Sequence, residues 1–129
     1  MAGRARVIAR IVAVPLAAAF AFFGYFKTFA SRAVLEQHHA WTIALPDLAG
    51  RLVGVSELVT AAALLLAAIR PARARLAIAA ASYAIVNQAA AALVHVGRGE
   101  AGALPQNAVL AAFALIVALG FATRPVRPT

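Results

Sequence analysis

Four long apolar runs dominate the chain, and each is long enough to cross a lipid bilayer as a helix. They cover about residues 7–28, 50–69, 76–96 and 105–123. At about 1.5 Å per residue, some 20 helical residues span the roughly 30 Å of a hydrocarbon core. Turn signals such as Pro46-Asp47 and Arg70-Pro71 separate the runs. The pattern predicts an all-α fold, an integral membrane four-helix bundle, as a single domain over residues 1–129.

The first run also resembles a signal peptide, because Ala19-Phe20-Ala21 has the small-residue form of a cleavage site. The run continues past this point through Phe26 and is longer than the core of a signal peptide, which has about 7–15 residues. We therefore expect a retained helix, kinked at Pro15. In the longest connection, we expect a short surface helix over residues 32–41 with Trp41 as an interfacial anchor. The segment 97–103 is expected to be a small flexible loop.

The composition supports a membrane protein and limits the other classes of function. Hydrophobic residues make up 64% of the chain, and the mean hydropathy is +0.89. The formal charge of +8 would suit nucleic acid, but the basic residues flank the apolar runs. We therefore expect a lipid bilayer and no nucleic acid as the partner. The chain has no cysteine, which excludes thiol–disulfide exchange, iron–sulfur ligation and thiolate zinc sites in this chain.

The basic residues also predict the orientation of the bundle. Eight of them flank one side of the predicted membrane: Arg4, Arg6, Arg10, Arg70, Arg73, Arg75, Arg124 and Arg127. The other side carries Lys27, Arg32, Arg51 and Arg98, together with all four acidic residues. Cytoplasmic loops carry the excess of Lys and Arg. The count predicts an N-in/C-in topology.

Two opposite charges interrupt the apolar runs, namely Lys27 in the first and Glu57 in the second. An acidic residue at the middle of a membrane helix costs about 2.5–3.5 kcal/mol on insertion scales, so Glu57 should face protein and have a partner. Gly50, Gly54 and Glu57 fall on one helical face, where small residues allow a neighbouring helix to approach. We expect Lys27 to be that partner.

The other polar side chains within the runs gather in the half that the predicted topology turns outward. They are Tyr83, Asn87, Gln88, His95 and Asn107. We expect a cavity that opens outward, lined by these residues with Lys27 and Glu57. The same groups can instead form an amide network that fixes helix register. We interpret His38 and His39 as solvated loop residues and predict no metal site; a haem between His95 and a loop histidine has only the imidazole count in its favour.

Several short motifs together resemble the DoxX-like membrane proteins. They are Gly24-Tyr25-Phe26-Lys27, Gly54-Val55-Ser56-Glu57-Leu58, His95 and Pro105-Gln106-Asn107, in this order over residues 7–121. The resemblance implies a multi-pass protein of the bacterial cytoplasmic (inner) membrane, in a family named for a subunit of a thiosulfate:quinone oxidoreductase. It also implies that Lys27 and Glu57 are recurrent buried charges, and that the chain works with a redox protein partner.

Two functions remain open from the sequence. In the first, a redox-associated subunit or small enzyme holds a quinone-like or other lipophilic molecule. Glu57 then accepts or relays a proton, and Lys27 keeps it ionised or stabilises an oxyanion. Without cysteine, the cofactor would be a quinone or would belong to the partner. In the second, the chain is a non-catalytic scaffold or small-solute carrier whose Lys–Glu pair is structural. A homodimer is compatible with either function.

Overall fold

A computed structural model describes residues 1–124 of the chain, and these residues fold into helices and short connections without strands. The elements in order are α1 (Ala2–Phe29), α2 (Arg32–Gln37), η1 (Trp41–Ala44), α3 (Asp47–Ile69), α4 (Ala74–Gly97), η2 (Ala101–Ala103) and α5 (Leu104–Ala122). Within this part of the chain, α1, α3, α4 and α5 are long and apolar enough to cross a membrane. The predicted all-α membrane bundle is confirmed. Arg127, which entered the charge count, lies outside the described residues.

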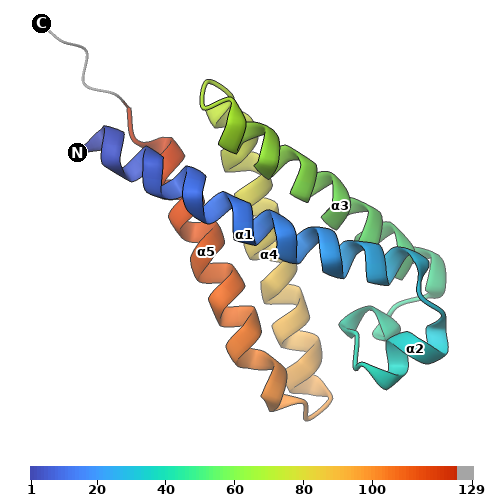
Figure 1. Cartoon of the computed structure of the whole chain (residues 1–129). Helices are drawn as coiled ribbons and strands as arrows, with labels where there is room; N and C mark the ends of the chain where they lie inside the picture. Colours follow the sequence, from blue (N-terminus) through green and yellow to red (C-terminus); the bar gives the residue numbers. More distant parts are fainter. Residues whose placement is uncertain (125–129) are drawn as a thin grey trace, which may run out of the picture.

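The four long helices pack in a ring (Figure 1). Helix α3 packs against α1 and α4, and α5 packs against α4 and α1. The start of α1 and the end of α5 lie at one end of the bundle, where the Arg6 guanidinium donates to the carbonyl oxygens of Phe121 (3.0 Å) and Thr123 (2.9 Å). We call this the terminal end. The opposite end, with α2, η1 and the α4–α5 connection, is called the α2 end (Figure 1).

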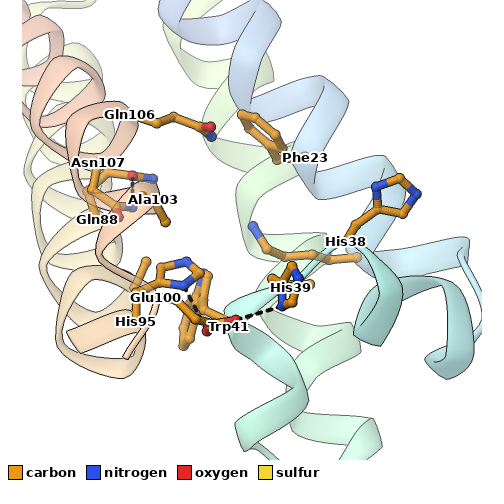
Figure 2. Close-up of a pocket in the computed structure, with 14 residues that line it drawn as sticks. Phe23, His38, His39, Trp41, Gln88, His95, Glu100, Ala103, Gln106 and Asn107 are labelled. Carbon is orange, nitrogen blue, oxygen red and sulfur yellow. Dashed lines mark hydrogen bonds and ion pairs between the residues drawn. The ribbon is translucent and has the colours of Figure 1, made fainter. Parts of the chain in front are cut away.

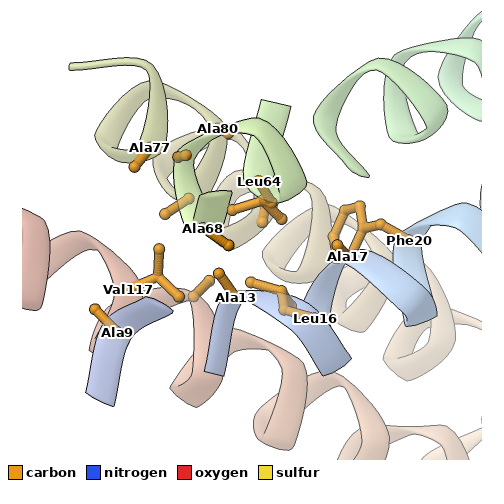
Figure 3. Close-up of a cluster of buried hydrophobic side chains, with 14 of the residues drawn as sticks. Ala9, Ala13, Leu16, Ala17, Phe20, Leu64, Ala68, Ala77, Ala80 and Val117 are labelled. Atoms are coloured by element: carbon orange, nitrogen blue, oxygen red, sulfur yellow. The ribbon is translucent and has the colours of Figure 1, made fainter. Parts of the chain in front are cut away.

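Small side chains close the terminal end (Figure 3). Ala9, Ala13 and Ala17 of α1 are fully buried, and they pack with Leu64 of α3 and Val117 of α5. Between membrane helices, close backbone approach and van der Waals contact replace the hydrophobic driving force of a soluble core. The alanine spacing in α1 therefore explains why this helix contacts two neighbours along its length.

The connection between α1 and α3 differs from the single helix expected over residues 32–41. Ser31 caps the start of α2, since its side chain accepts a hydrogen bond from the Val34 N–H (3.2 Å), and the helix ends at Gln37. His39 then adopts a positive φ of 54°, which is incompatible with a continuing right-handed helix. Trp41 consequently starts the separate 3₁₀ helix η1. This break turns His39 and Trp41 toward α4 and α5.

The connection between α4 and α5, expected to be a small flexible loop, contains a short 3₁₀ helix. Gly99 has a positive φ of 73°, which reverses the chain after α4. The single 3₁₀ turn η2 follows and leads directly into α5, where Pro105 occupies the first helical turn. The short reversal holds Glu100 beside the last turn of α4.

Candidate functional site

A close approach of α1 and α3 brings two opposite charges together. A Cβ atom on Gly24 would lie 2.8 Å from the Gly54 carbonyl oxygen and 2.9 Å from the Glu57 Cβ. Only glycine fits at such distances, since anything larger forces the backbones apart. With Gly24 against Gly54, Lys27 lies one turn further along α1 and faces Glu57. The glycines of the two sequence motifs therefore position the charges of the same motifs.

Lys27 and Glu57 form a buried ion pair. The Lys27 Nζ lies 2.8 Å from Glu57 Oε1 and 3.0 Å from Oε2, and the two residues are 8% and 1% exposed. Asn87 of α4 donates a further hydrogen bond to Oε1 (3.1 Å). Arg51 fixes the end of α1 by donating to the carbonyl oxygens of Lys27 (3.0 Å) and Ala30. The charge that the sequence predicts to be paired is paired with the predicted residue.

A chain of amide side chains continues from Glu57 across the bundle. Asn87 Nδ2 donates to Glu57, Gln88 Nε2 donates to Asn87 Oδ1 (3.1 Å), and Asn107 Nδ2 of α5 donates to Gln88 Oε1 (2.9 Å). We call Asn87, Gln88 and Asn107 the amide chain. Together with the ion pair it connects α1, α3, α4 and α5 through buried polar contacts.

A cavity of about 460 Å³ lies beside the amide chain at the α2 end (Figure 2). Its walls are formed by Phe23, Lys27, His38, His39, Ala40, Trp41, Gln88, Ala91, His95, Glu100, Gly102, Ala103, Gln106 and Asn107. We call it the Lys27 cavity. It combines apolar surfaces from α1, η1, α4 and η2 with one ammonium and several amides.

The structure separates the seven predicted site residues into three groups. Four of them line the Lys27 cavity: Lys27, Gln88, His95 and Asn107. Glu57 and Asn87 do not line the cavity, but they form hydrogen bonds with the lining residues Lys27 and Gln88. Tyr83 lies outside the cavity lining, and its hydroxyl forms a hydrogen bond with Ser56 of α3. Of the two residues in the ion pair, only Lys27 therefore lines the cavity, and Glu57 holds it from behind.

A cluster around Glu100 forms the edge of the cavity, and sequence reasoning missed it. Glu100 Oε2 lies 2.8 Å from His39 Nδ1, while Oε1 lies 3.2 Å from His95 Nδ1 and 3.2 Å from Arg98 Nε. Partial burial raises the pKa of Glu100, but the hydrogen bond from His95 and the positive charges of Arg98, His95 and His39 outweigh it and lower the pKa. Glu100 therefore ties the loop before η1 to the end of α4.

A signal for this cluster is present in the sequence, although it is indirect. The third and fourth runs are separated by only a few residues, so Glu100 has to lie at the same end of the bundle as His95. The position of His39 depends on the break between α2 and η1, which periodicity does not reveal. Among the described residues, no group of three His, Cys, Asp or Glu side chains is arranged to hold a metal ion.

Two buried polar atoms at the cavity have no partner within the described residues. The Trp41 indole Nε1 lacks an acceptor, and the Asn107 Oδ1 lacks a donor. Both residues line the Lys27 cavity. Buried polar groups are nearly always hydrogen-bonded in native proteins, and an unmade bond costs about 1–3 kcal/mol. These two atoms therefore keep unused hydrogen-bonding capacity at the cavity wall.

The comparison with protein families agrees with this arrangement. The profile of the DoxX-like family matches residues 11–117, which include the ion pair, the amide chain and the Glu100 cluster. The chain belongs to the DoxX-like family. The resemblance seen in the short motifs is thereby confirmed. No curated protein and no solved structure matches the chain.

Proposed function

We propose that this DoxX-like protein holds a quinone-like lipophilic molecule in the Lys27 cavity and serves a redox partner as a membrane subunit or small enzyme. The observation that carries the proposal is a buried ammonium on the wall of a cavity of about 460 Å³. Ligand cavities of about 300–1,000 Å³ with apolar walls and few polar groups are typical of small-molecule sites.

The residues present suit the ring of a quinone. Phe23, Trp41, Ala91 and Ala103 offer apolar surface, and Lys27 and Trp41 offer N–H donors to a carbonyl oxygen. A bound quinone would supply two-electron, two-proton redox chemistry. Lys27 has three N–H groups, of which two are directed to Glu57. The third is left for the ligand or for the face of the Phe23 ring, whose centroid lies 5.6 Å from Nζ.

The geometry changes the division of roles between the two charged residues. Because Lys27 lines the cavity and Glu57 does not, Lys27 is the group that contacts the ligand and stabilises negative charge on its oxygen. Glu57 holds the ammonium in place through both of its oxygens. Proton exchange with the ligand then involves Lys27 or the Glu100 cluster directly, and Glu57 only through Lys27.

We further propose that the protein lies in the bacterial cytoplasmic membrane with both termini inside, so that the Lys27 cavity opens outward. The support is the excess of Lys and Arg at the terminal end. Because the chain has no cysteine, Ala72→Cys and Ala101→Cys each introduce a single thiol. In intact cells, an impermeant maleimide should label Ala101→Cys and leave Ala72→Cys unlabelled until the cells are opened. The reverse pattern contradicts the orientation.

The proposed ligand is tested by purifying the protein in mild detergent and identifying co-purifying lipophilic molecules by mass spectrometry. Lys27→Met should abolish retention of the ligand. The matched variant is the double substitution Lys27→Met/Glu57→Leu, which removes both charges and so preserves the fold. A quinone retained by the parent and lost from both variants supports the proposal. Equal retention by a folded double variant contradicts it.

A scaffold is the second candidate, and a specific observation favours it. The ion pair and the amide chain connect all four long helices of the described chain by hydrogen bonds. Such a network also serves to fix helix register. If the parent carries no lipophilic molecule and binds none on titration, the role that remains for these residues is structural.

A further inference from the structure

The hydrogen bonds of the amide chain all run in one direction. Glu57 accepts from Lys27 through both oxygens, and it therefore offers Asn87 an acceptor. Asn87 must donate to it with Nδ2, which leaves Asn87 Oδ1 to accept from Gln88. Gln88 in turn accepts from Asn107 Nδ2 through its Oε1. Each amide has one acceptor and one donor end, so the carboxylate determines the orientation of every amide after it.

The consequence appears at the last member of the chain. Asn107 donates a hydrogen bond from Nδ2 to Gln88, and the residue is only 8% exposed. Its Oδ1 is buried and has no hydrogen-bond partner. Asn107 lines the Lys27 cavity, so the cavity meets the amide chain at an acceptor. The cavity wall also carries donors, namely the Lys27 ammonium and the Trp41 indole N–H. The site is thus complementary to a molecule that both accepts and donates hydrogen bonds.

We propose that the Lys27 cavity selects the reduced, hydroxyl-bearing form of its ligand, a quinol, over the oxidised quinone. This inference rests on the proposed function. A quinone oxygen only accepts, so it can use Lys27 and Trp41 but leaves the Asn107 Oδ1 unpaired or opposed by another acceptor. A quinol hydroxyl accepts from the same donors and also donates to Asn107 Oδ1. Asn107 is then the residue that discriminates the two forms, and Asn87 is a positioning residue that acts through Gln88.

The experiment measures the affinities of the full-length protein in detergent for duroquinone and for its reduced form, duroquinol. Trp41 is the only tryptophan and lines the cavity, so its fluorescence reports quinone binding directly. Quinol affinity follows from displacement of duroquinone under anaerobic conditions. We expect the parent to bind duroquinol about tenfold more tightly than duroquinone. Duroquinol satisfies the buried Asn107 acceptor and duroquinone leaves it without a hydrogen bond.

Three variants separate selectivity from general binding. Asn107→Leu should reduce the ratio of the two affinities to near one, mainly by weakening the binding of duroquinol. Asn87→Leu interrupts the chain outside the cavity and frees Gln88 and Asn107 to turn over, so the preference should fall although Asn107 is unchanged. Gln37→Leu is the matched control, because this exposed amide of α2 lies outside both the Lys27 cavity and the amide chain. It should leave the preference as in the parent. Circular dichroism verifies the helical fold of each variant.

The possible failures are distinguishable. Equal affinity of the parent for the two forms, or an undiminished preference in both Asn107→Leu and Asn87→Leu, overturns the selectivity and leaves the proposed function standing. Absence of binding of either form to the parent overturns the proposed function and the selectivity together.

Discussion

The two ends of this bundle use the same four helices in opposite ways. At the terminal end, buried alanines pack with Leu64 and Val117 and bring the helices into contact. At the α2 end, the helices enclose a cavity, an ion pair and three amides. The contrast teaches that assembly and the proposed ligand binding are separable here, because the apolar end can hold the helices together while the polar end remains partly open.

The largest effect is expected from breaking the ion pair while leaving its acidic member. Lys27→Met leaves the Glu57 carboxylate buried without a counter-charge, which should cost about 3–5 kcal/mol of the free energy of unfolding. Adding Glu57→Leu should restore most of this loss. The measurement is unfolding in mixed micelles followed by circular dichroism. A single variant as stable as the parent would show that the pair does not couple the helices.

A cavity at the terminal end should reduce stability without affecting the ligand. Leu64 is fully buried, so Leu64→Ala is expected to cost about 2–5 kcal/mol of unfolding free energy. The dissociation constant for duroquinone should stay within about twofold of the parent, because Leu64 is outside the Lys27 cavity. A large change in affinity would mean that packing at the terminal end and binding at the α2 end are coupled and not separable.

Filling the Lys27 cavity should have the reverse outcome. Ala103→Phe places a ring in the cavity, so duroquinone quenching of Trp41 should be lost while the free energy of unfolding changes by less than about 1 kcal/mol. Ala112→Phe, on the exposed side of α5, is the control and should leave the quenching intact. Retained quenching in Ala103→Phe would place the binding site elsewhere.

The smallest effect concerns the edge of the cavity and depends on pH. Because the pKa of folded Glu100 is below the usual 4.5, its contacts stabilise the folded connection above that pH. This contribution is lost as the pH falls below 4.5 and through the lower folded value. Trp41 emission, two residues from His39, should change in this acid range. Glu100→Gln should abolish the transition; an unchanged transition would assign it to another group.

The four spanning helices and the Lys27–Glu57 pairing could be predicted because each follows from a strong local constraint. Long apolar runs have one stable solution in lipid, and a buried carboxylate demands a cation. The layering of the site could not be predicted. Whether Glu57 or Lys27 faces the cavity depends on the approach of Gly24 to Gly54, and periodicity does not give the relative depth of two side chains.

The site residues from the connections were harder to anticipate for a different reason. His39 and Trp41 reach the cavity only because the backbone reverses at a positive φ, a conformation that histidine seldom adopts. Tyr83 shows that two side chains in one helical row need not line the same cavity. It lies at i−4 from Asn87, but its hydroxyl contacts Ser56 outside the cavity lining.

The placement of the start of α1 and the end of α5 opposite the Lys27 cavity has a consequence for the proposed redox partner. Helix α3, with 23 residues, extends about 35 Å between the two ends. That length is too great for rapid electron tunnelling in one step. Under the proposed function, a protein docked at the terminal end therefore stays electrically remote from the ligand and does not block its entry. The proposed redox partner then has to approach over α2 and η1 or from within the bilayer.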